Sequence, residues 1–210
     1  MRKIKFFSAV VVFLMISASV FALDLDTICM GLSEHKVTRG NFTQIKTVNS
    51  AKGKRDLKSY GVFVLCSDGI IWDTQKPFPS KMIIGKTKII QTSLDGKQSI
   101  INGDDNITFA NISATVSAVF SNNIDEINRN FNTSVKSFPD NKWELSLYPK
   151  DATIASAIGE IVLTGTVAGS SVSLDSMSLK ESENSNVTYQ FTDQIYVEEL
   201  TSDEKAFFAL

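Results

Sequence analysis

Few side chains in this sequence of 210 residues could take part in catalysis. His35 is the single histidine, and one imidazole cannot build a zinc site that needs several histidine or cysteine ligands. No Gly-x-Ser-x-Gly turn offers a nucleophilic serine. Gly85-Lys86-Thr87 is similar to the end of a phosphate-binding loop, but that motif requires a glycine where Ser80 stands. The sequence therefore predicts a protein that is not an enzyme and needs neither cofactor nor metal.

Acidic residues occur in pairs that do not have the arrangement of a metal site. Asp104 and Asp105 follow one another in a short loop, whereas a calcium loop needs more oxygen ligands at wider spacing. Glu198 and Glu199 are adjacent on a predicted strand, so their side chains should point to opposite faces.

The two cysteines, Cys29 and Cys66, are the remaining reactive side chains. An even number of cysteines in an oxidising compartment permits one disulfide bond. The alternative is two buried thiols that act as small apolar residues. Spacing along the chain does not show whether the two Cα atoms come close enough to be bridged, so both interpretations stay open.

The first 22 residues have the outline of a secretory signal peptide. Arg2, Lys3 and Lys5 precede an apolar run from Phe6 to Ile16, and a small residue, Ala22, ends a plausible cleavage site. Residues 23–210 then form a single exported domain. The whole chain has a net charge of −2, and loss of three cations leaves the mature part near −5. This acidic balance argues against nucleic-acid binding and against strong attraction to an anionic membrane.

The stretch from Leu57 to Gly85 organises the rest of the chain. Two strand patterns flank the turn Ser67-Asp68-Gly69, and a third strand follows a bend that contains two prolines. Both faces of these strands are apolar, whereas an antiparallel sheet with one wet face should alternate apolar and polar residues. Both faces must therefore be covered, or one of them receives an apolar ligand.

The remaining pattern is mostly β. A short helix is expected over 24–35, with Gly40 ending the segment, and a strand follows over 41–49. A hairpin surrounds Leu94-Asp95-Gly96. Residues 107–120 fit both helix and strand, with helix favoured, and 124–131 continue as a second helical segment. Strands are expected over 142–147, 161–167, 172–179, 187–192 and 194–198. Roughly ten short strands and two helical segments predict a meander in a sandwich or barrel.

The chain resembles the periplasmic outer-membrane lipoprotein carrier family, the LolA-like proteins. The residues that carry the resemblance are Phe42-Thr43-Gln44, Gly61-x-Phe63, Ile70-Ile71-Trp72, Pro77, Ile84-x-Lys86, Trp143-Glu144-Leu145-x-Leu147-x-Pro149-Lys150, Ile161-x-Leu163 and Thr188-Tyr189-Gln190-Phe191. The resemblance implies a mainly β fold with helices (α+β), namely an incomplete, strongly curved antiparallel β-barrel with a helical lid.

The resemblance also implies an apolar cavity that takes acyl chains. The expected lining residues are Phe63, Leu65, Ile70, Trp72, Met82, Ile84, Phe109, Ile112, Val116 and Phe120. Ordinary core packing is the alternative for each of them, because core and cavity share a composition. The turn over residues 66–69 lacks the Arg-Pro pair with which the well-studied members hold the lid shut.

Two functions follow as hypotheses. The first is a periplasmic carrier that moves acylated lipoproteins, or another lipid, from the inner to the outer membrane. Its partners would be an inner-membrane exporter and an outer-membrane acceptor, and we expect a monomer. The second is a binding or sensing module on the same half-barrel, with a filled interior. The fold alone does not decide between them.

Overall fold

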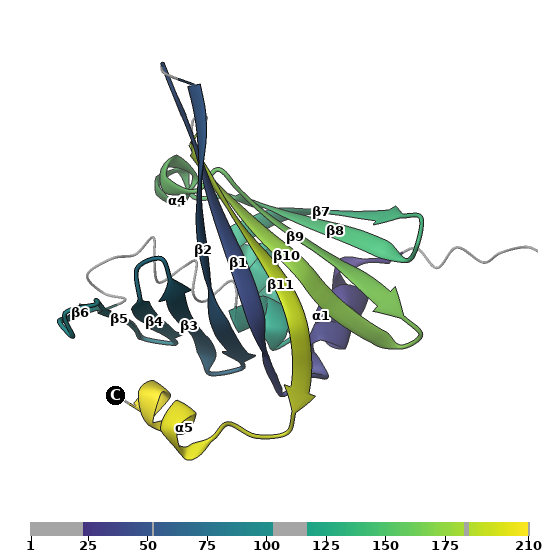
Figure 1. The fold of residues 1–210 in the computed structure, drawn as a ribbon. Helices are drawn as coiled ribbons and strands as arrows, with labels where there is room; N and C mark the ends of the chain where they lie inside the picture. The colour runs from purple at the N-terminus through teal and green to yellow at the C-terminus, as the bar shows by residue number, and fades with distance from the viewer. Residues whose placement is uncertain (1–22, 52, 103–116, 183–184, 210) are drawn as a thin grey trace, which may run out of the picture.

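The computed structural model describes residues 23–51, 53–102, 117–182 and 185–209. Within them, eleven strands form one antiparallel sheet (Figure 1): β1 (Val37–Ser50), β2 (Gly53–Cys66), β3 (Gly69–Lys76), β4 (Ser80–Gly85), β5 (Lys88–Thr92), β6 (Gln98–Asn102), β7 (Phe131–Phe138), β8 (Lys142–Pro149), β9 (Glu160–Ala168), β10 (Ser171–Ser182) and β11 (Ser185–Val197). The same residues include the helices α1 (Leu25–Ser33), α3 (Ile124–Asn130), α4 (Ala152–Ala157) and α5 (Ser202–Ala209), and residues 117–120 are helical as well.

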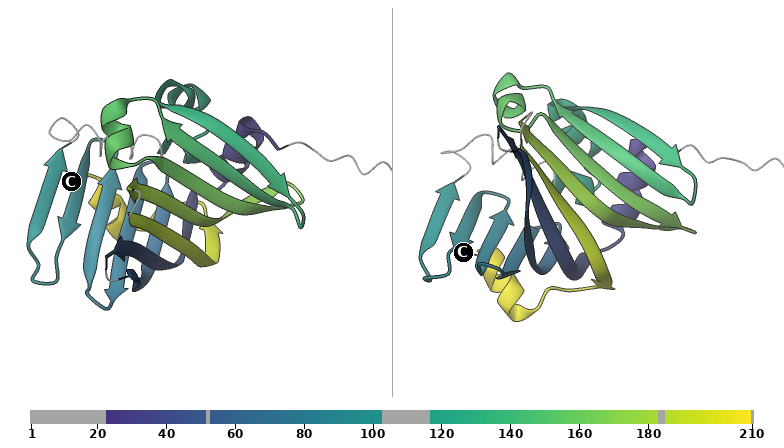
Figure 2. Two further views of the ribbon diagram at one scale, coloured as in Figure 1. Left: turned by 90° about the horizontal axis from the view of Figure 1, so that it is seen from above. Right: turned by 45° about the horizontal axis from the view of Figure 1, so that its top comes forward.

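The sheet consists of two meanders joined through the pairing of β1 with β11. Its strand order is β6-β5-β4-β3-β2-β1-β11-β10-β9-β8-β7, so β6 and β7 are the free edges. The two halves lean toward each other around α1 without closing a barrel (Figure 2). The predicted fold class, an incomplete antiparallel barrel with helices, is confirmed.

The turn between β2 and β3 is where the sequence places it. Cys66 pairs with Gly69 across Ser67 and Asp68. Gly69 has a φ of +142°, and a Cβ at this position would lie 1.9 Å from the carbonyl oxygen of Ile84. Glycine is required here because any side chain would meet backbone of β4.

Two expected boundaries are wrong. Gly40 does not end a segment but lies inside β1, where a Cβ would come within 2.9 Å of the Phe63 ring. Asp193 does not separate two strands. It has a φ of +53° inside β11, opposite an irregularity in the β1–β11 register between Arg39 and Asn41. A bulge bends a strand without ending it, and sequence pattern alone does not distinguish the two.

Three elements are missing from the sequence prediction: β7, α4 and α5. The signal for α5 was present as Thr201-x-x-Glu204, the pattern of a capping box. The hydroxyl of Thr201 accepts from the backbone N–H of Glu204 at 3.3 Å, and a Glu204 carboxylate oxygen accepts from the Thr201 N–H at 2.7 Å.

The apolar side chains separate into two clusters on opposite faces of the sheet. The inner cluster faces α1 and contains Ile28, Cys29, Leu32, Phe42, Phe63, Leu65, Ile70, Trp72, Ala118, Val119, Ile127, Phe131, Trp143, Leu145, Leu147, Ile158, Ile161, Leu163, Val172, Leu174, Met177 and Phe191. The outer cluster contains Val37, Val64, Cys66, Ile71, Ile83 and Ile90, with Val197, Leu200, Phe207 and Phe208 packed against it.

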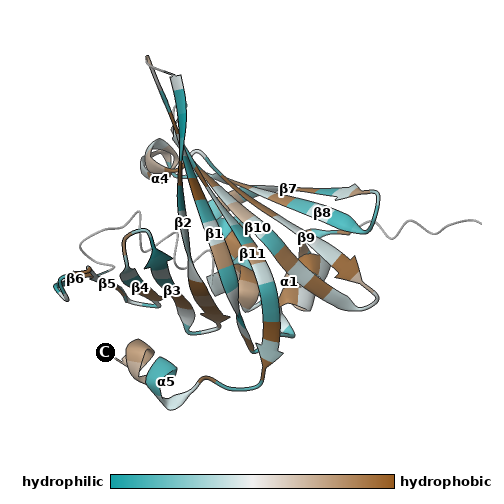
Figure 3. Ribbon diagram, viewed as in Figure 1, coloured by the Kyte–Doolittle hydropathy of each residue, from teal (hydrophilic) through white to brown (hydrophobic). Residues whose placement is uncertain are grey.

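Strand alternation explains this division. Successive residues of a strand point to opposite faces, so Phe63 and Leu65 enter the inner cluster while Val64 and Cys66 enter the outer one. Hydrophobic residues accordingly concentrate in the first half of β3 and in the end of β2 that pairs with it, whereas the rest of each strand is more hydrophilic (Figure 3). The strands that the sequence shows to be apolar on both faces are thus covered on both faces.

Helix α5 covers the outer cluster, and an ion pair links it to β1. The Nε of Arg39 donates to Oε1 of Glu204 at 2.8 Å, and the two side chains are 21% and 14% exposed. Hydrogen bonding from Arg39 lowers the pKa of the Glu204 carboxyl to about 2. The pair ties the first turn of α5 to β1. Further along the helix, Phe207 and Phe208 pack against the outer cluster.

Candidate functional site

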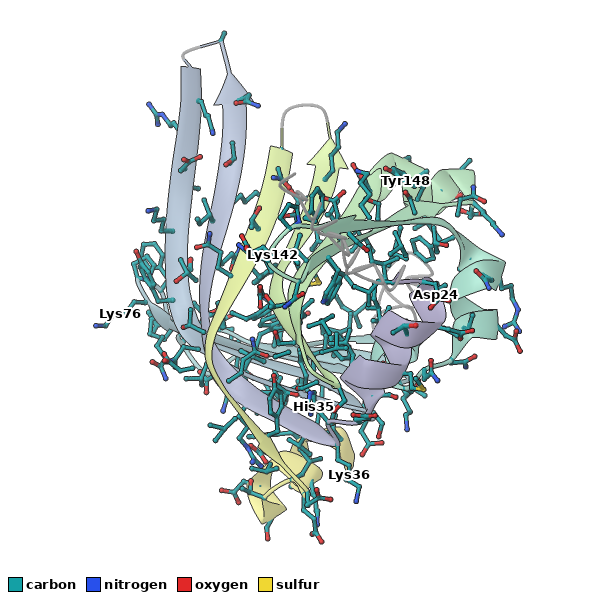
Figure 4. The ribbon with its side chains drawn as sticks, turned by 90° about the vertical axis from the view of Figure 1, so that its right-hand side faces the viewer. Asp24, His35, Lys36, Lys76, Lys142 and Tyr148 are labelled. Atoms are coloured by element: carbon teal, nitrogen blue, oxygen red, sulfur yellow. The ribbon has the colours of Figure 1, made fainter. Side chains whose placement is uncertain are left out.

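The inner face of the sheet gathers the residues that the sequence predicts for a cavity. Phe63, Leu65, Ile70 and Trp72 are all buried in the inner cluster, with exposed fractions of 1% to 4%. Side chains fill the space between α1 and the sheet (Figure 4). The four residues therefore share one location, as predicted. Their role as the lining of a cavity stays a prediction.

Other predicted residues lie at the margin of this cluster or outside the described part of the chain. Met82, Ile84 and Phe120 are partly buried and pack against the inner cluster. Phe109, Ile112 and Val116, expected as lid or lining, fall within residues 103–116 and lie outside the described residues. Residues 117–120, which the sequence assigns to the same segment, are helical.

Five aromatic rings meet in the middle of the inner cluster. The ring of Trp72 stacks on Tyr189 with centroids 4.7 Å apart and lies 5.8 Å from Phe191. Phe42 meets Trp72 edge-on at 5.2 Å, and Phe63 lies 4.9 Å from Phe191. Offset and edge-to-face contacts of this kind stabilise by about 0.5–1.5 kcal/mol each beyond burial.

These ring distances also report the curvature of the sheet. Trp72 is on β3 and Tyr189 on β11, three strands apart in the sheet. Neighbouring strands are spaced by about 4.8 Å, so a flat sheet would separate them by roughly 14 Å. The contact of their rings shows that the sheet bends strongly around its inner face, as a half-barrel should.

The sequence prediction missed three of these five aromatic residues. Phe42, Tyr189 and Phe191 carry the family resemblance but are absent from the predicted lining. Tyr189 and Phe191 could have been found from their spacing, because residues two apart on one strand point to the same face. Burial, and to a smaller extent the Glu181 carboxylate, raises the pKa of the Tyr189 hydroxyl to about 12, so it remains neutral in this setting.

Helix α1 covers the inner face through a narrow apolar stripe of Ile28, Cys29 and Leu32. Asp24 caps its first turn by accepting from the Thr27 N–H at 2.8 Å. Gly31 brings the helix close to β10, because a Cβ there would lie 2.2 Å from a methyl carbon of Val172. The sequence-predicted helix over 24–35 is thus confirmed as a cover of the sheet.

The possible disulfide between Cys29 and Cys66 is not formed. Both thiols are free and buried. Cys29 belongs to the inner cluster and Cys66 to the outer one, so the sheet lies between them. Burial raises the pKa of Cys29 to about 12 and also raises that of Cys66. Both are structural thiols, as the alternative interpretation has it.

A groove of about 820 Å³ opens where the inner and outer clusters meet. Its lining includes Phe120 from the inner side, Cys66 and Leu200 from the outer side, and charged residues of the 198–205 segment. His35 also lies on this groove. Its ring stacks on Tyr196 with centroids 3.6 Å apart, and Nε2 is 3.1 Å from the carbonyl oxygen of Val172. These contacts give the histidine a packing role.

Two further findings concern the described residues alone. In these parts of the chain, no three His, Cys, Asp or Glu side chains come together in a way that could hold a metal ion. None of the helices found there has the length and apolar character needed to cross a membrane.

Comparison with known proteins fits this architecture. The family described as "Outer membrane lipoprotein carrier protein LolA" matches residues 33–207. The chain belongs to the LolA family. Members of this family are periplasmic carrier proteins rather than enzymes, so membership gives the chain a lipoprotein- or lipid-carrier fold. No curated protein sequence matches the chain.

Two solved structures are similar to this LolA-family chain. A LolA superfamily protein from Nitrosomonas europaea has 8% sequence identity and a TM-score of 0.45, with 85% of this chain and 94% of that chain covered. A DUF1329 family protein from Desulfovibrio piger has 7% identity and a TM-score of 0.48, with 88% of this chain and 94% of that chain covered.

Proposed function

We propose that this protein carries the acyl chains of lipoproteins, or of a related lipid, on the inner face of its half-barrel. Residues 1–22 would direct export to the periplasm and be removed, and residues 23–210 would act there as one carrier domain. The mechanism is transfer of apolar chains between binding sites, without covalent chemistry.

The observation that carries this proposal is the aromatic group on the curved inner face. Trp72, Phe63, Phe42 and Phe191 converge from four strands in the inner cluster, to which α1 also contributes. Burial of one CH₂ group is worth about 0.8 kcal/mol, so part of an acyl chain already binds with useful and reversible affinity. In this structure the rings contact one another, and a bound chain would enter by displacing α1 and parting them.

The arrangement of covers supports such a displacement. The inner cluster is covered by α1, and the outer cluster is covered separately by α5. Movement of α1 would therefore leave the packing of the outer face in place. An inner-membrane exporter and an outer-membrane acceptor are the partners that this transfer requires, and the acidic mature chain would be repelled by anionic membranes between deliveries.

The test uses a triacylated lipopeptide and the exported protein. Both tryptophans, Trp72 and Trp143, are in the inner cluster, so their emission reports on this face. We expect a one-to-one complex by native mass spectrometry and a shift of tryptophan emission. Phe120→Asp should weaken binding by about tenfold or more, because it replaces an apolar side chain that packs against the inner cluster and lines the groove beside it.

The matched control is Phe138→Asp, which changes an aromatic residue that is 47% exposed on β7. Its affinity for the lipopeptide should equal that of the unaltered protein. If no complex forms, or if the two variants bind alike, the inner face is not the acyl site.

A binding or sensing module with a filled interior is the second candidate. It is favoured by the near-complete burial of Phe63 and Trp72 at 1% and 4% exposure. The same measurement separates the two functions. A protein that is purified without lipid and ignores the lipopeptide would support the module.

A further inference from the structure

A second pocket lies on the opposite face of the sheet, beneath the C-terminal end of α5. It has a volume of about 330 Å³ and is bounded by the outer face of β4 and β5 on one side and by α5 on the other. Ile83 and Ile90 form its floor and are 3% and 2% exposed. Phe207 and Phe208 form its apolar wall. The interior of this pocket is suited to a hydrocarbon chain.

The rim of the pocket is cationic. Among the described residues that line it, Lys86, Lys88 and Lys205 carry positive charge and Asp68 carries the one carboxylate. Lys86 is paired with Asp68 at 2.9 Å, and Lys205 with Glu199 at 3.0 Å. Lys88 is half-buried, and the part of the chain that the structure describes offers it no ion-pair partner. A half-buried ammonium group that has no ion-pair partner among the described residues favours an anion beside it.

The size of the pocket limits the ligand to one short chain. A volume of about 330 Å³ is at the lower end of the range for ligand sites. It has room for roughly eleven water-sized groups at about 30 Å³ each, too few for a lipid with several long chains. An inorganic anion would leave the apolar floor unused. Charge and shape together select a chain of about ten carbons with an anionic head.

We propose that this pocket binds a single-chain fatty-acid carboxylate, with its chain between α5 and the sheet and its head at Lys88. This site is separate from the inner face and does not depend on the proposed carrier function. Because the ligand would contact both α5 and the sheet, it would bind only while α5 is docked and would stabilise that state.

Reporters for the two faces already exist in the chain. Cys66 belongs to the outer cluster that α5 covers, whereas Trp72 and Trp143 belong to the inner one. A ligand beneath α5 should slow alkylation of Cys66 and leave tryptophan emission unchanged. A ligand on the inner face should change tryptophan emission instead.

The probes are decanoate, below its micellar range, and decan-1-ol, which has the same chain without the charge. We expect saturable one-to-one binding of decanoate, several-fold slower alkylation of Cys66, and about tenfold weaker binding of decan-1-ol. Lys88→Met should weaken decanoate binding by about tenfold and leave decan-1-ol binding unchanged. Lys142→Met, at an exposed lysine on β8 (labelled in Figure 4), is the control and should alter neither.

A second variant tests the apolar part of the site. Ala209→Trp adds a bulky ring at the exposed end of α5 that lines the pocket, and it should reduce the binding of both probes. The proposal is overturned if decanoate does not bind, if decanoate and decan-1-ol bind equally, or if Lys88→Met behaves like Lys142→Met. It is also overturned if decanoate shifts tryptophan emission without protecting Cys66. Loss of lipopeptide binding with decanoate binding intact would instead reject only the carrier function.

Discussion

The inner and outer faces of the sheet differ in how much of the chain builds them. The inner cluster takes buried residues from both meanders, from α1 and from α3. The outer cluster draws its buried residues from β1 to β5 alone and is covered by α5. On the other meander the outer face is polar. There Thr164 and Ser176 are hydrogen-bonded at 2.8 Å, and Ser178 and Thr188 at 2.9 Å.

This difference separates global stability from local opening. Loss of a contact in the inner cluster affects the whole sheet at once, because both halves meet there. Loss of a contact in the outer cluster affects the docking of one short helix, because α5 has few buried contacts of its own. Regions with few buried apolar contacts open locally while the remainder of the protein stays folded.

The largest effect is expected from truncation in the inner cluster. Leu145→Ala should lower the free energy of unfolding by about 3 kcal/mol, because this side chain is fully buried and leaves a cavity. Urea unfolding followed by tryptophan emission measures it. Ile100→Ala, at a residue that is 57% exposed on β6, is the control and should stay within about 0.5 kcal/mol of the unaltered protein. Similar losses of unfolding free energy in the two variants would show that burial in the inner cluster does not set global stability.

The next effect concerns the anchor of α5. Glu204→Gln keeps a capping residue but removes the charge that pairs with Arg39, which should cost about 1–2 kcal/mol. Alkylation of Cys66 by a maleimide should become about tenfold faster, as α5 undocks more often. Alkylation of Cys29 should not change, because this thiol lies on the inner face. Equal acceleration at both cysteines, read by peptide mass mapping, would indicate global unfolding instead.

The same anchor predicts a dependence on pH. The pKa of Glu204 is lowered from 4.5 to about 2 in the folded protein, chiefly by hydrogen bonding from Arg39. Its stabilising contribution is therefore complete above pH 4.5 and is lost as the pH falls toward 2. Hydrogen exchange, corrected for intrinsic rates, should show α5 losing protection in this interval before Leu145 and Leu147 do. Simultaneous loss in all of these residues would contradict a local transition.

The smallest effect is expected where ion pairs are fully solvated. Lys36 and Glu198 are paired at 2.7 Å, but their side chains are 69% and 80% exposed. Lys36→Met should change neither urea unfolding nor the alkylation of Cys66 measurably, since solvent screens such pairs. A clear acceleration at Cys66 would mean that the linker before α5 depends on this pair as well as on Arg39.

Local sequence chemistry predicted much of the fold. The turn at Ser67-Asp68-Gly69 and the hairpin at Gly96 lie where their turn residues place them, because φ angles of +142° and +78° favour glycine. Errors occurred where a local signal had two meanings. Gly40 marked a close approach to the Phe63 ring and not the end of a segment, and Asp193 marked a bulge in β11 and not a turn.

The candidate site was predicted only in part, for a related reason. Trp72 and Phe63 follow from the resemblance and from strand alternation. Their partners Tyr189 and Phe191 come from more than a hundred residues further along the chain. They reach Trp72 because β1 pairs with β11 and the sheet curves. No local pattern contains that pairing.

The sequence by itself determined that the strands around Leu57–Gly85 are apolar on both faces, that adjacent residues lie on opposite faces, and that catalytic side chains are few. Only the tertiary structure decided which face curves inward and what covers each one. When the residues on both faces of a strand are apolar, the period of two does not show which face is the inner one. The long-range pairing of β1 with β11, the packing of α1 and the Arg39–Glu204 anchor of α5 make that choice.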